Sequence, residues 1–517
     1  MKSKAVVELT VCFAIMSLVF LGGCGSDETA PSIDTSFIPQ TVFFNDTGST
    51  EYYLFQGRAT DNTNVDSVEV SGDNGTNWQA AVIDNDPPNE DWDVQWSYLA
   101  SSGVLSAGMH TVLVRAADRD GNETISTPVI VDVNVGSTIG SLLAVFSGPL
   151  PGGAIGLSTG EGFAYGDSAG SLTIPINTSL IVLGSGYGDM LTSGGNPSDG
   201  NSVATILETA PGTPSLFSVD ANLTIRNVRL LGGVHGIHLS DSGSANPQLS
   251  VQDCLFDRQS EWGVYAESNG GVNVEILSSI LDANRADNPG GGGGLYLDNV
   301  IYTVYDSVFY EQSATAIGAG VQVLGSAGNI DNSIFGGNAL AIWASGGSPV
   351  ITSCNISGAA FTTNGINLTG GPGDAEISRN TIDGNANGYG LRVGGEMELT
   401  LRNNEITNNG LSGVLIDSTL SNPSLTKINM GESVDQGRNL FDGNSHPSGE
   451  GGWDNQVFVT LATSEGSTPI PANWNYWGGM VSNNLDVNRV IIDGKDDAAR
   501  ATLAIGGIHF STSEVGP

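Results

Sequence analysis

The sequence predicts an all-β chain whose C-terminal two-thirds form a solenoid, and three observations support this fold class. A short strand motif, a small residue followed by an apolar–variable–apolar triplet, recurs about every 25 residues, within the range of solenoid repeats. The repeats are rich in β-branched, aromatic, asparagine and glycine residues and show no 3.6-residue apolar stripe. Glycine accounts for 72 of the 517 residues, which suits tight turns better than helices.

Two strands recur in each repeat at a fixed offset. Copies of the first strand begin at Gly236, Gly263, Gly294, Gly320, Ala341, Gly365, Gly390 and Gly413. Copies of the second begin at Ile225, Val251, Val304, Ile330, Ile351, Ile377 and Leu401, and another apolar residue follows each five positions later. In several repeats an asparagine comes three residues after that: Asn284, Asn338, Asn385, Asn409 and Asn444. We expect these amides to stack coil upon coil and to bond one another in a ladder.

These repeats, and the closing segment Asn-Trp-Asn-Tyr-Trp-Gly at residues 473–478, resemble the right-handed parallel β-helix family of pectate-lyase-like solenoids. The resemblance covers about residues 140–517. Leucine-rich repeats have a similar period, but they need a leucine-dense signature that this sequence does not have. The β-helix family includes lyases, hydrolases, epimerases and non-enzymatic surface proteins, so the resemblance implies a fold and leaves the activity open.

The N-terminus has the pattern of a secretory leader. Lys2 and Lys4 precede a mostly apolar run that is too short for a membrane span. The run ends in Leu-Gly-Gly-Cys, which resembles the bacterial lipobox, where the cysteine carries lipid and becomes the first mature residue. We therefore predict a signal peptide over 1–23, a lipid anchor on Cys24 with a tether to residue 35, and an outer-membrane location facing the periplasm or the medium. The alternative is an ordinary signal peptide with an incidental cysteine.

Residues 36–135 form a separate predicted domain of alternating strands bounded by turn residues. The segments 58–61, 67–71 and 114–122 resemble bacterial Ig-like domains, which implies a β-sandwich. Because the domain has no cysteine pair, we expect Trp78, Trp92 and Trp96 to fill its core. Asp118 to Asn122 begin like a calcium loop, but Val129 stands where the distant glutamate belongs, so a hairpin turn explains this segment better.

The charge of the chain limits its partners. The formal net charge is −38, and only Lys427 and Lys495 are lysines beyond the leader. Nucleic acid needs a basic footprint and is excluded, and a strongly polyanionic glycan would be repelled at long range. Neutral sugars, cations or a basic partner are compatible, although the acidity can also serve solubility alone.

Cysteine usage indicates a fold without crosslinks. Cys254 and Cys354 occupy the same place in their coils, and four coils separate them. At about 4.8 Å per coil they lie beyond disulfide reach, so we interpret both as small buried apolar residues.

The variable position of the first strand motif faces solvent, because alternate side chains of a strand point to opposite faces. This predicted outward column contains His238, Tyr265, Tyr296, Gln322, Trp343, Asn367, Arg392 and Leu415. Aromatic faces with amide and guanidinium donors suit a sugar chain, whose C–H faces stack and whose hydroxyls bond, so these residues are candidate glycan ligands. Alternatively, outward aromatic residues simply favour strands.

Two carboxylates lie beside this column on adjacent coils. Glu267 and Asp298 each come two residues after a tyrosine of the column. At about 5 Å apart they have the spacing of a retaining glycosidase pair, and like-charge repulsion would raise one pKa. They are also candidate ligands for a hard cation such as Ca²⁺, or ordinary surface acids of an acidic chain.

The catalytic signatures of the family's polygalacturonases and alginate epimerases are missing, and no arginine base with a cluster of calcium carboxylates is clear. The leading hypothesis is therefore a non-enzymatic, lipid-anchored envelope protein whose β-helix binds a glycan or a protein partner. The alternatives are a polysaccharide lyase or glycoside hydrolase that uses Glu267 and Asp298 on a neutral or weakly charged glycan, and a structural spacer or adhesin.

Overall fold

The computed structural model divides the chain into two compact units, with Tyr52–Asn134 in the first and Val135–Pro517 in the second. The described residues are 28–45, 52–84, 92–136, 142, 145, 153–158, 160–164, 172–174, 179–183, 205–208, 215–240, 246–284, 292–310, 319–357, 364–417, 428–445, 456–459, 469–478, 491–492 and 503–505. The leader and Cys24 lie outside them. None of the described helices has the length and apolarity needed to cross a membrane.

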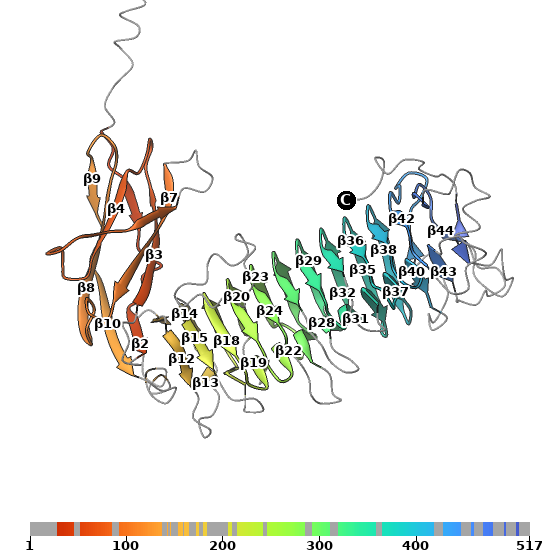
Figure 1. Cartoon of the computed structure of the whole chain (residues 1–517), viewed down its shortest axis with the longest axis horizontal. Helices are drawn as coiled ribbons and strands as arrows, with labels where there is room; N and C mark the ends of the chain where they lie inside the picture. The colour runs from red at the N-terminus through yellow and green to blue at the C-terminus, as the bar shows by residue number, and fades with distance from the viewer. Residues whose placement is uncertain are drawn as a thin grey trace, which may run out of the picture. The chain divides into compact units, whose positions relative to one another are not determined.

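The first unit contains two antiparallel sheets (Figure 1). One has the strand order β1 (Ser32–Asp34), β3 (Tyr52–Thr60), β7 (Asp93–Ser101) and β6 (Val82–Asp84). In the other, β8 (Gly108–Ala117) pairs with β4 (Ser67–Ser71), β9 (Glu123–Ile125) and β10 (Val129–Gly136), and β4 also pairs with β5 (Gln79–Ala80). β2 spans Thr41–Asn45. The Ig-like identity of this unit stays a prediction.

The expectation that three tryptophans fill the core of the first unit is wrong for two of them. Trp96 is buried against Gly57, where an added Cβ would come within 2.4 Å of the indole. Trp92 is 45% exposed, and Trp78 is only half-buried, with the Arg115 guanidinium 4.5 Å from its ring centroid. Strands of this unit bury alternate side chains, so smaller residues such as Val68 and Val114 complete the core.

The Asp118 loop is a hairpin turn between β8 and β9, as the missing distal glutamate predicted. The Asp118 carboxylate accepts hydrogen bonds from the backbone N–H of Asn122 at 2.8 Å and from its side-chain amide at 2.7 Å. These bonds hold the pKa of Asp118 below its usual value against the opposing effect of burial, which is the largest single influence on it.

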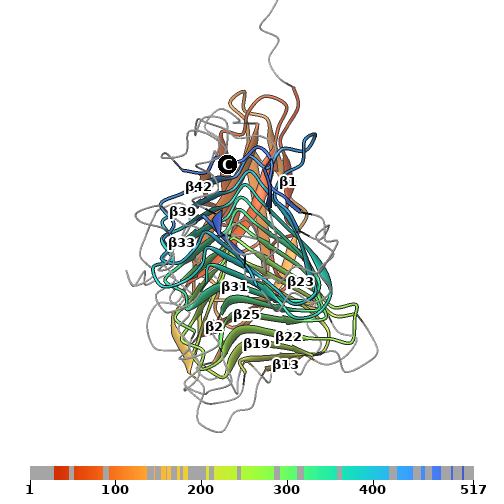
Figure 2. The same cartoon turned by 90° about the vertical axis from the view of Figure 1, so that its right-hand side faces the viewer.

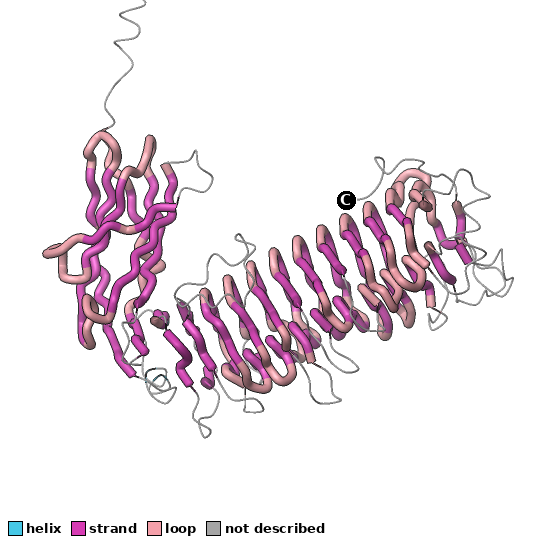
Figure 3. Tube along the Cα trace, in the orientation of Figure 1, coloured by secondary structure: helices cyan, strands magenta, loops and turns pink. Residues whose placement is uncertain are grey.

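The second unit is a solenoid in which successive coils add strands to three parallel sheets, and this confirms the predicted architecture (Figure 3). The strands of the first solenoid sheet are β11 (Ala154–Leu157), β14 (Ser179–Leu183), β17 (Asn222–Arg226), β20 (Gln248–Gln252), β23 (Asn273–Leu277), β26 (Ile301–Tyr305), β29 (Ala327–Asp331), β32 (Ser348–Thr352), β35 (Gly373–Ser378), β38 (Met397–Arg402) and β41 (Ile428–Asn429). The second sheet consists of β12 (Gly160–Ala164), β15 (Thr205–Glu208), β18 (Val228–Leu231), β21 (Leu255–Asp257), β24 (Ile280–Asp282), β27 (Val308–Tyr310), β30 (Ile334–Gly336), β33 (Asn355–Ser357), β36 (Thr381–Asp383), β39 (Glu405–Thr407) and β42 (Leu440–Asp442).

The third solenoid sheet follows one side of the stacked coils (Figure 2). Its strands are β13 (Leu172–Ile174), β16 (Phe217–Val219), β19 (His235–Ser240), β22 (Trp262–Glu267), β25 (Gly293–Asp298), β28 (Ala319–Leu324), β31 (Leu340–Ser345), β34 (Ile366–Thr369), β37 (Leu391–Val393), β40 (Val414–Ile416), β43 (Val457–Val459) and β45 (Ile491–Ile492). A short parallel pair joins β44 (Ile470–Pro471), which precedes β45 in the sequence, to β46 (Leu503–Ala504), which follows it.

The interior of the solenoid contains columns of apolar residues and the predicted asparagine ladder. Phe309 and Phe335 occupy matching positions of β27 and β30 and stack with their ring centroids 4.8 Å apart. In the ladder, the side-chain amide of Asn385 donates to the Asn409 side-chain oxygen at 2.7 Å, and Asn409 donates in the same way to Asn444. All three amides are fully buried, so the ladder gives each buried polar group a partner in the next coil.

A second interior ladder runs at the turn between the first and second sheets and was not predicted. Its members are Cys254, Ser279, Ser307, Ser333, Cys354, Asn380, Asn404, Asn439 and Asn475. Seven of these residues donate their backbone N–H to the side-chain oxygen of the member in the next coil: Cys254, Ser279, Ser307, Cys354, Asn380, Asn404 and Asn439. Both cysteines are buried and free, as expected.

The same turn has one backbone conformation in nine successive coils. The residue before each ladder member has a left-handed backbone: Asp253, Ser278, Asp306, Asn332, Ser353, Arg379, Asn403, Arg438 and Trp474 have φ values between 45° and 60°. Non-glycine residues adopt this region rarely, and aspartate and asparagine tolerate it best. Its repetition keeps the coils in register, and so brings side chains of the third sheet into columns.

Candidate functional site

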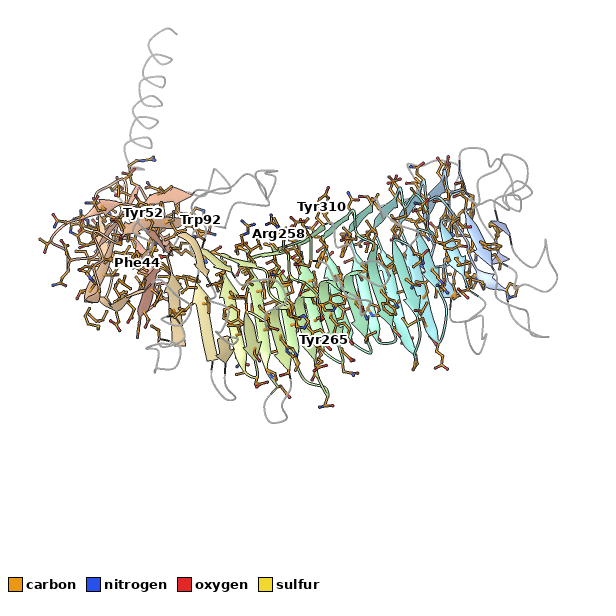
Figure 4. All side chains as sticks on the ribbon, turned by 60° about the horizontal axis from the view of Figure 1, so that its bottom comes forward. Phe44, Tyr52, Trp92, Arg258, Tyr265 and Tyr310 are labelled. Atoms are coloured by element: carbon orange, nitrogen blue, oxygen red, sulfur yellow. The ribbon has the colours of Figure 1, made fainter. Side chains whose placement is uncertain are left out.

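The predicted outward column exists in the third sheet. The parallel register places His238, Tyr265, Tyr296, Gln322, Trp343, Asn367, Arg392 and Leu415 opposite one another on successive strands from β19 to β40. Figure 4 places Tyr265 on a different side of the solenoid from Tyr310 and Arg258. Strand alternation was therefore enough to predict both the membership and the order of the column.

Two members of the column are not exposed as predicted. Gln322 is only 7% exposed and Leu415 only 6%. Gln322 lies between Tyr296 and Trp343 on the adjacent strands, and these larger side chains shield it. Side-chain direction alone therefore overestimates the exposure of a small residue between two aromatic ones.

The C-terminal half of the column is engaged in internal contacts. The Arg392 guanidinium pairs with the Asp417 carboxylate, with its Nε 2.7 Å from Oδ2. The Trp343 indole N–H donates to the Thr369 hydroxyl at 3.1 Å. The amide oxygen of Asn367 is buried and has no hydrogen-bond partner among the described residues. The Arg392 guanidinium, which the sequence predicted as a donor to a glycan, and the Trp343 indole N–H thus already have partners within the protein.

The N-terminal half forms a group of rings that we call the aromatic cluster: His235, His238, Trp262, Tyr265 and Tyr296. Tyr265 and Tyr296 stack with centroids 4.5 Å apart and planes inclined by 4°. His235 stacks on Tyr265 from the other neighbouring strand at 4.8 Å. Both faces of the Tyr265 ring are therefore covered, so sugar stacking on this ring, which the sequence suggested, is blocked in this arrangement. The ring edges and hydroxyl groups remain.

His235 and Trp262 belong to the site but were not predicted. They lie opposite each other at the start of β19 and β22, three residues before the column. The Trp262 indole lies over Gly293 on β25, where an added Cβ would come within 2.9 Å of the ring. The sequence signal that could have predicted this contact was a bulky aromatic residue at position 262 with a glycine at the matching position of the next coil.

Glycines at the second position of these strands bring the coils close together. A Cβ at Gly263 would approach the Gly294 carbonyl oxygen to 2.9 Å, and one at Gly294 would approach the Gly320 carbonyl oxygen to 2.5 Å. The small residue that opens each motif is therefore a packing requirement of the third sheet.

Glu267 and Asp298 lie opposite each other on β22 and β25, as predicted. The Tyr265 hydroxyl donates to the Glu267 carboxylate at 3.1 Å, and the Asn299 amide donates to Asp298 at 2.9 Å. Burial, and then repulsion from Glu267, raise the pKa of Asp298. Burial and the nearby carboxylates also raise the pKa of Tyr265, so its hydroxyl stays protonated and can donate.

The two histidines border the acids. His235 accepts a hydrogen bond at Nδ1 from the Trp262 backbone N–H at 3.4 Å, so in the neutral ring the proton lies on Nε2, which is 3.7 Å from the Glu261 carboxylate. Burial, and then the proximity of His238, lower the pKa of His235 to about 3. The Nε2 atom of His238 is 4.0 Å from Glu267. At neutral pH, His235 therefore adds no positive charge to the site.

Glu267 and Asp298 form a pair, not a completed metal site. Across the residues that the structure describes, no three or more histidine, cysteine, aspartate or glutamate side chains converge on a point where a metal could bind. A cation held by these two carboxylates would need further oxygen ligands from water or from a bound molecule.

Comparison with known families gives one match. Residues 364–446 match the family model described as the right handed beta helix region. The solenoid is a right-handed β-helix. The matched residues run from the start of β34 to just beyond β42, in coils where both interior ladders consist of asparagine. A comparison of the whole chain with curated proteins gives no match.

Proposed function

We propose that this protein binds a glycan on the third sheet of its β-helix, at the aromatic cluster and the Glu267–Asp298 pair. In this proposal the protein binds the glycan without catalysing a reaction on it. The observation that carries this proposal is the stacked pair Tyr265 and Tyr296, with a carboxylate beside each ring. A phenol hydroxyl can donate to and accept from the hydroxyl groups of a sugar, and a carboxylate can accept from them.

The arrangement favours contact through ring edges and hydroxyl groups. Successive strands present these groups about 4.8 Å apart, so that neighbouring sugar units of one chain could contact neighbouring coils. The half-buried tyrosines are ordered by stacking before any ligand arrives, which lowers the entropy lost on binding.

Alanine variants of the two tyrosines test the proposal. We expect Tyr265→Ala and Tyr296→Ala to lose most retention on an array of neutral and weakly charged polysaccharides. Tyr305→Ala is the matched control, since Tyr305 is 45% exposed on the first sheet, away from the cluster. Retention that is unchanged in both cluster variants would contradict this site.

A second candidate function, glycoside hydrolysis, is favoured by the raised pKa of Asp298 beside Glu267. Two carboxylates on adjacent strands, one of them with a raised pKa, match the acid and nucleophile pair of a retaining glycosidase. Release of reducing ends from a neutral polysaccharide, abolished in Glu267→Gln, would establish this activity. Binding without release would favour the non-enzymatic function.

The leader supports an anchor on Cys24, and an outer-membrane location is part of the proposal. Several acyl chains together give stable anchoring, because each buried CH₂ adds about 0.8 kcal/mol. We expect the protein to fractionate with outer membranes and Cys24→Ser to lose both the lipid mass and the membrane association. Membrane association that survives in Cys24→Ser would contradict the anchor.

A further inference from the structure

We propose that the glycan bound at this site carries free, protonated amino groups, as a polymer of unacetylated hexosamine does. This inference rests on the proposed glycan-binding function and names its ligand class.

The acids of this site lack arginine and lysine partners among the described residues. Among the ion pairs of the described residues, the only basic group near Glu267 is His238 Nε2 at 4.0 Å, and Asp298 has none. The neighbouring His235 is held neutral by burial. Two adjacent carboxylates therefore share one face without an arginine or lysine among the described side chains to offset their charge.

Other buried acids of the solenoid do have arginine partners. Arginine neutralises a buried or partly buried carboxylate in two places, where Asp257 pairs with Arg229 and Asp417 with Arg392. Asp417 follows β40, a strand of the same third sheet, so this sheet can place an arginine beside an acid. At Glu267 and Asp298 the sequence leaves the repulsion uncompensated, which is expected if a ligand supplies the opposite charge.

The oxygens of this site match the hydrogen-bond donors of an ammonium group. An ammonium group has three N–H donors and no acceptor, and here it would meet two carboxylates and the oxygens of two phenols. Hydrogen bonds between an ammonium and a carboxylate are shorter and stronger than neutral ones. A neutral sugar hydroxyl can bond to the same oxygens but cannot offset their charge, and an anionic sugar would be repelled by them.

The hexasaccharides of glucosamine and of N-acetylglucosamine test whether the amino charge is recognised. The nitrogen is a free, protonated amine in the first and a neutral acetylated amide in the second. We expect the full chain to bind the glucosamine hexamer at least tenfold more tightly in low salt, with EDTA present. Glu267→Gln and Asp298→Asn should each weaken that binding about tenfold or more, and rising NaCl should weaken it further. Glu376→Gln removes an exposed acid of the first sheet and should change nothing.

The failures are distinguishable. Equal affinity for both hexamers would overturn the amino-sugar inference and leave glycan binding intact, whereas binding of neither would remove the support for both. A hexalysine peptide bound as tightly as the glucosamine hexamer would show a general cation site and overturn the assignment to a glycan. The two amide variants keep the shape of the acids, and unchanged thermal unfolding would confirm that they are folded.

Discussion

The rings of Tyr265 and Tyr296 lie parallel with their centroids 4.5 Å apart, because the two residues occupy matching positions of adjacent strands. This stack is continued by His235, which covers the second face of Tyr265. The arrangement of the rings in the candidate site therefore follows from the constant spacing of the coils along the solenoid axis. A change that alters this spacing should also disturb the site.

His235 should make the β-helix sensitive to acid. Its pKa is about 3 in the folded protein and about 6.5 when unfolded, so the unfolded chain binds the extra proton between these values. The contribution of neutral His235 to stability is therefore complete above pH 6.5. It is lost as the pH falls towards 3, which lowers the free energy of unfolding by at most roughly 5 kcal/mol. Urea unfolding of the wild type and His235→Gln across this range measures the contribution. A difference between the two proteins that does not vary with pH would contradict the prediction.

Removal of one side chain from the second interior ladder should be costly. Asn404→Ala leaves the buried backbone N–H of Asn380 without its acceptor and removes one of the three acceptors of the Asn380 side-chain amide, which should lower the free energy of unfolding by about 2–5 kcal/mol. Asn404→Ser should cost less, because serine fills this place at Ser279, Ser307 and Ser333 and accepts the same kind of bond. Asn329→Ala, on the exposed face of β29, should stay within about 0.5 kcal/mol in chemical denaturation.

The close approach of coils at Gly294 predicts that even a methyl group is not tolerated there. In Gly294→Ala the new Cβ would meet the Gly320 carbonyl oxygen at 2.5 Å and the Phe309 ring at 2.6 Å, so we expect a loss of about 1–3 kcal/mol. Gly371→Ala is the control, because its nearest neighbour would be 4.0 Å away. Calorimetric unfolding of both variants measures the difference, and equal stability would show that the coils adjust without cost.

The two ladder cysteines should be inert in the folded protein. Burial raises the pKa of both the Cys254 and the Cys354 thiol to about 12, so neither forms the reactive thiolate near neutral pH. With Cys12 and Cys24 replaced by serine, we expect no reaction with a thiol reagent until denaturant is added, and then two equivalents. Rapid labelling of the native protein would mean that these coils open readily.

Much of the β-helix could be predicted from the sequence, because its repeat is simple. The alternation of Gly-apolar-x-apolar determined which side chains share a face, and the period determined which of them are neighbours. The asparagine ladder was recognisable because one residue type recurs at one offset, as at Asn385 and Asn409. Both inferences depend on the local chain alone.

The features that were missed depend on neighbours in other coils. The second ladder contains cysteine, serine and asparagine, so no single residue type marks the buried position that these side chains share. Gln322 is shielded by the side chains of adjacent strands, and Arg392 is paired with Asp417, 25 residues away. His235 joins the site because its ring reaches across to Tyr265. None of these contacts has a signature within a single repeat.

The left-handed turn that recurs before each ladder residue has a consequence for how such a protein can change length. A coil forms hydrogen bonds only with the coils on either side of it. Insertion or deletion of one complete coil between two such turns would therefore preserve the same pattern of bonds between neighbouring coils. The portion beyond the change would move along the axis by one strand spacing, about 4.8 Å. Insertion or deletion of whole coils would thus change the length of the β-helix without changing the internal geometry of the tyrosine–carboxylate site.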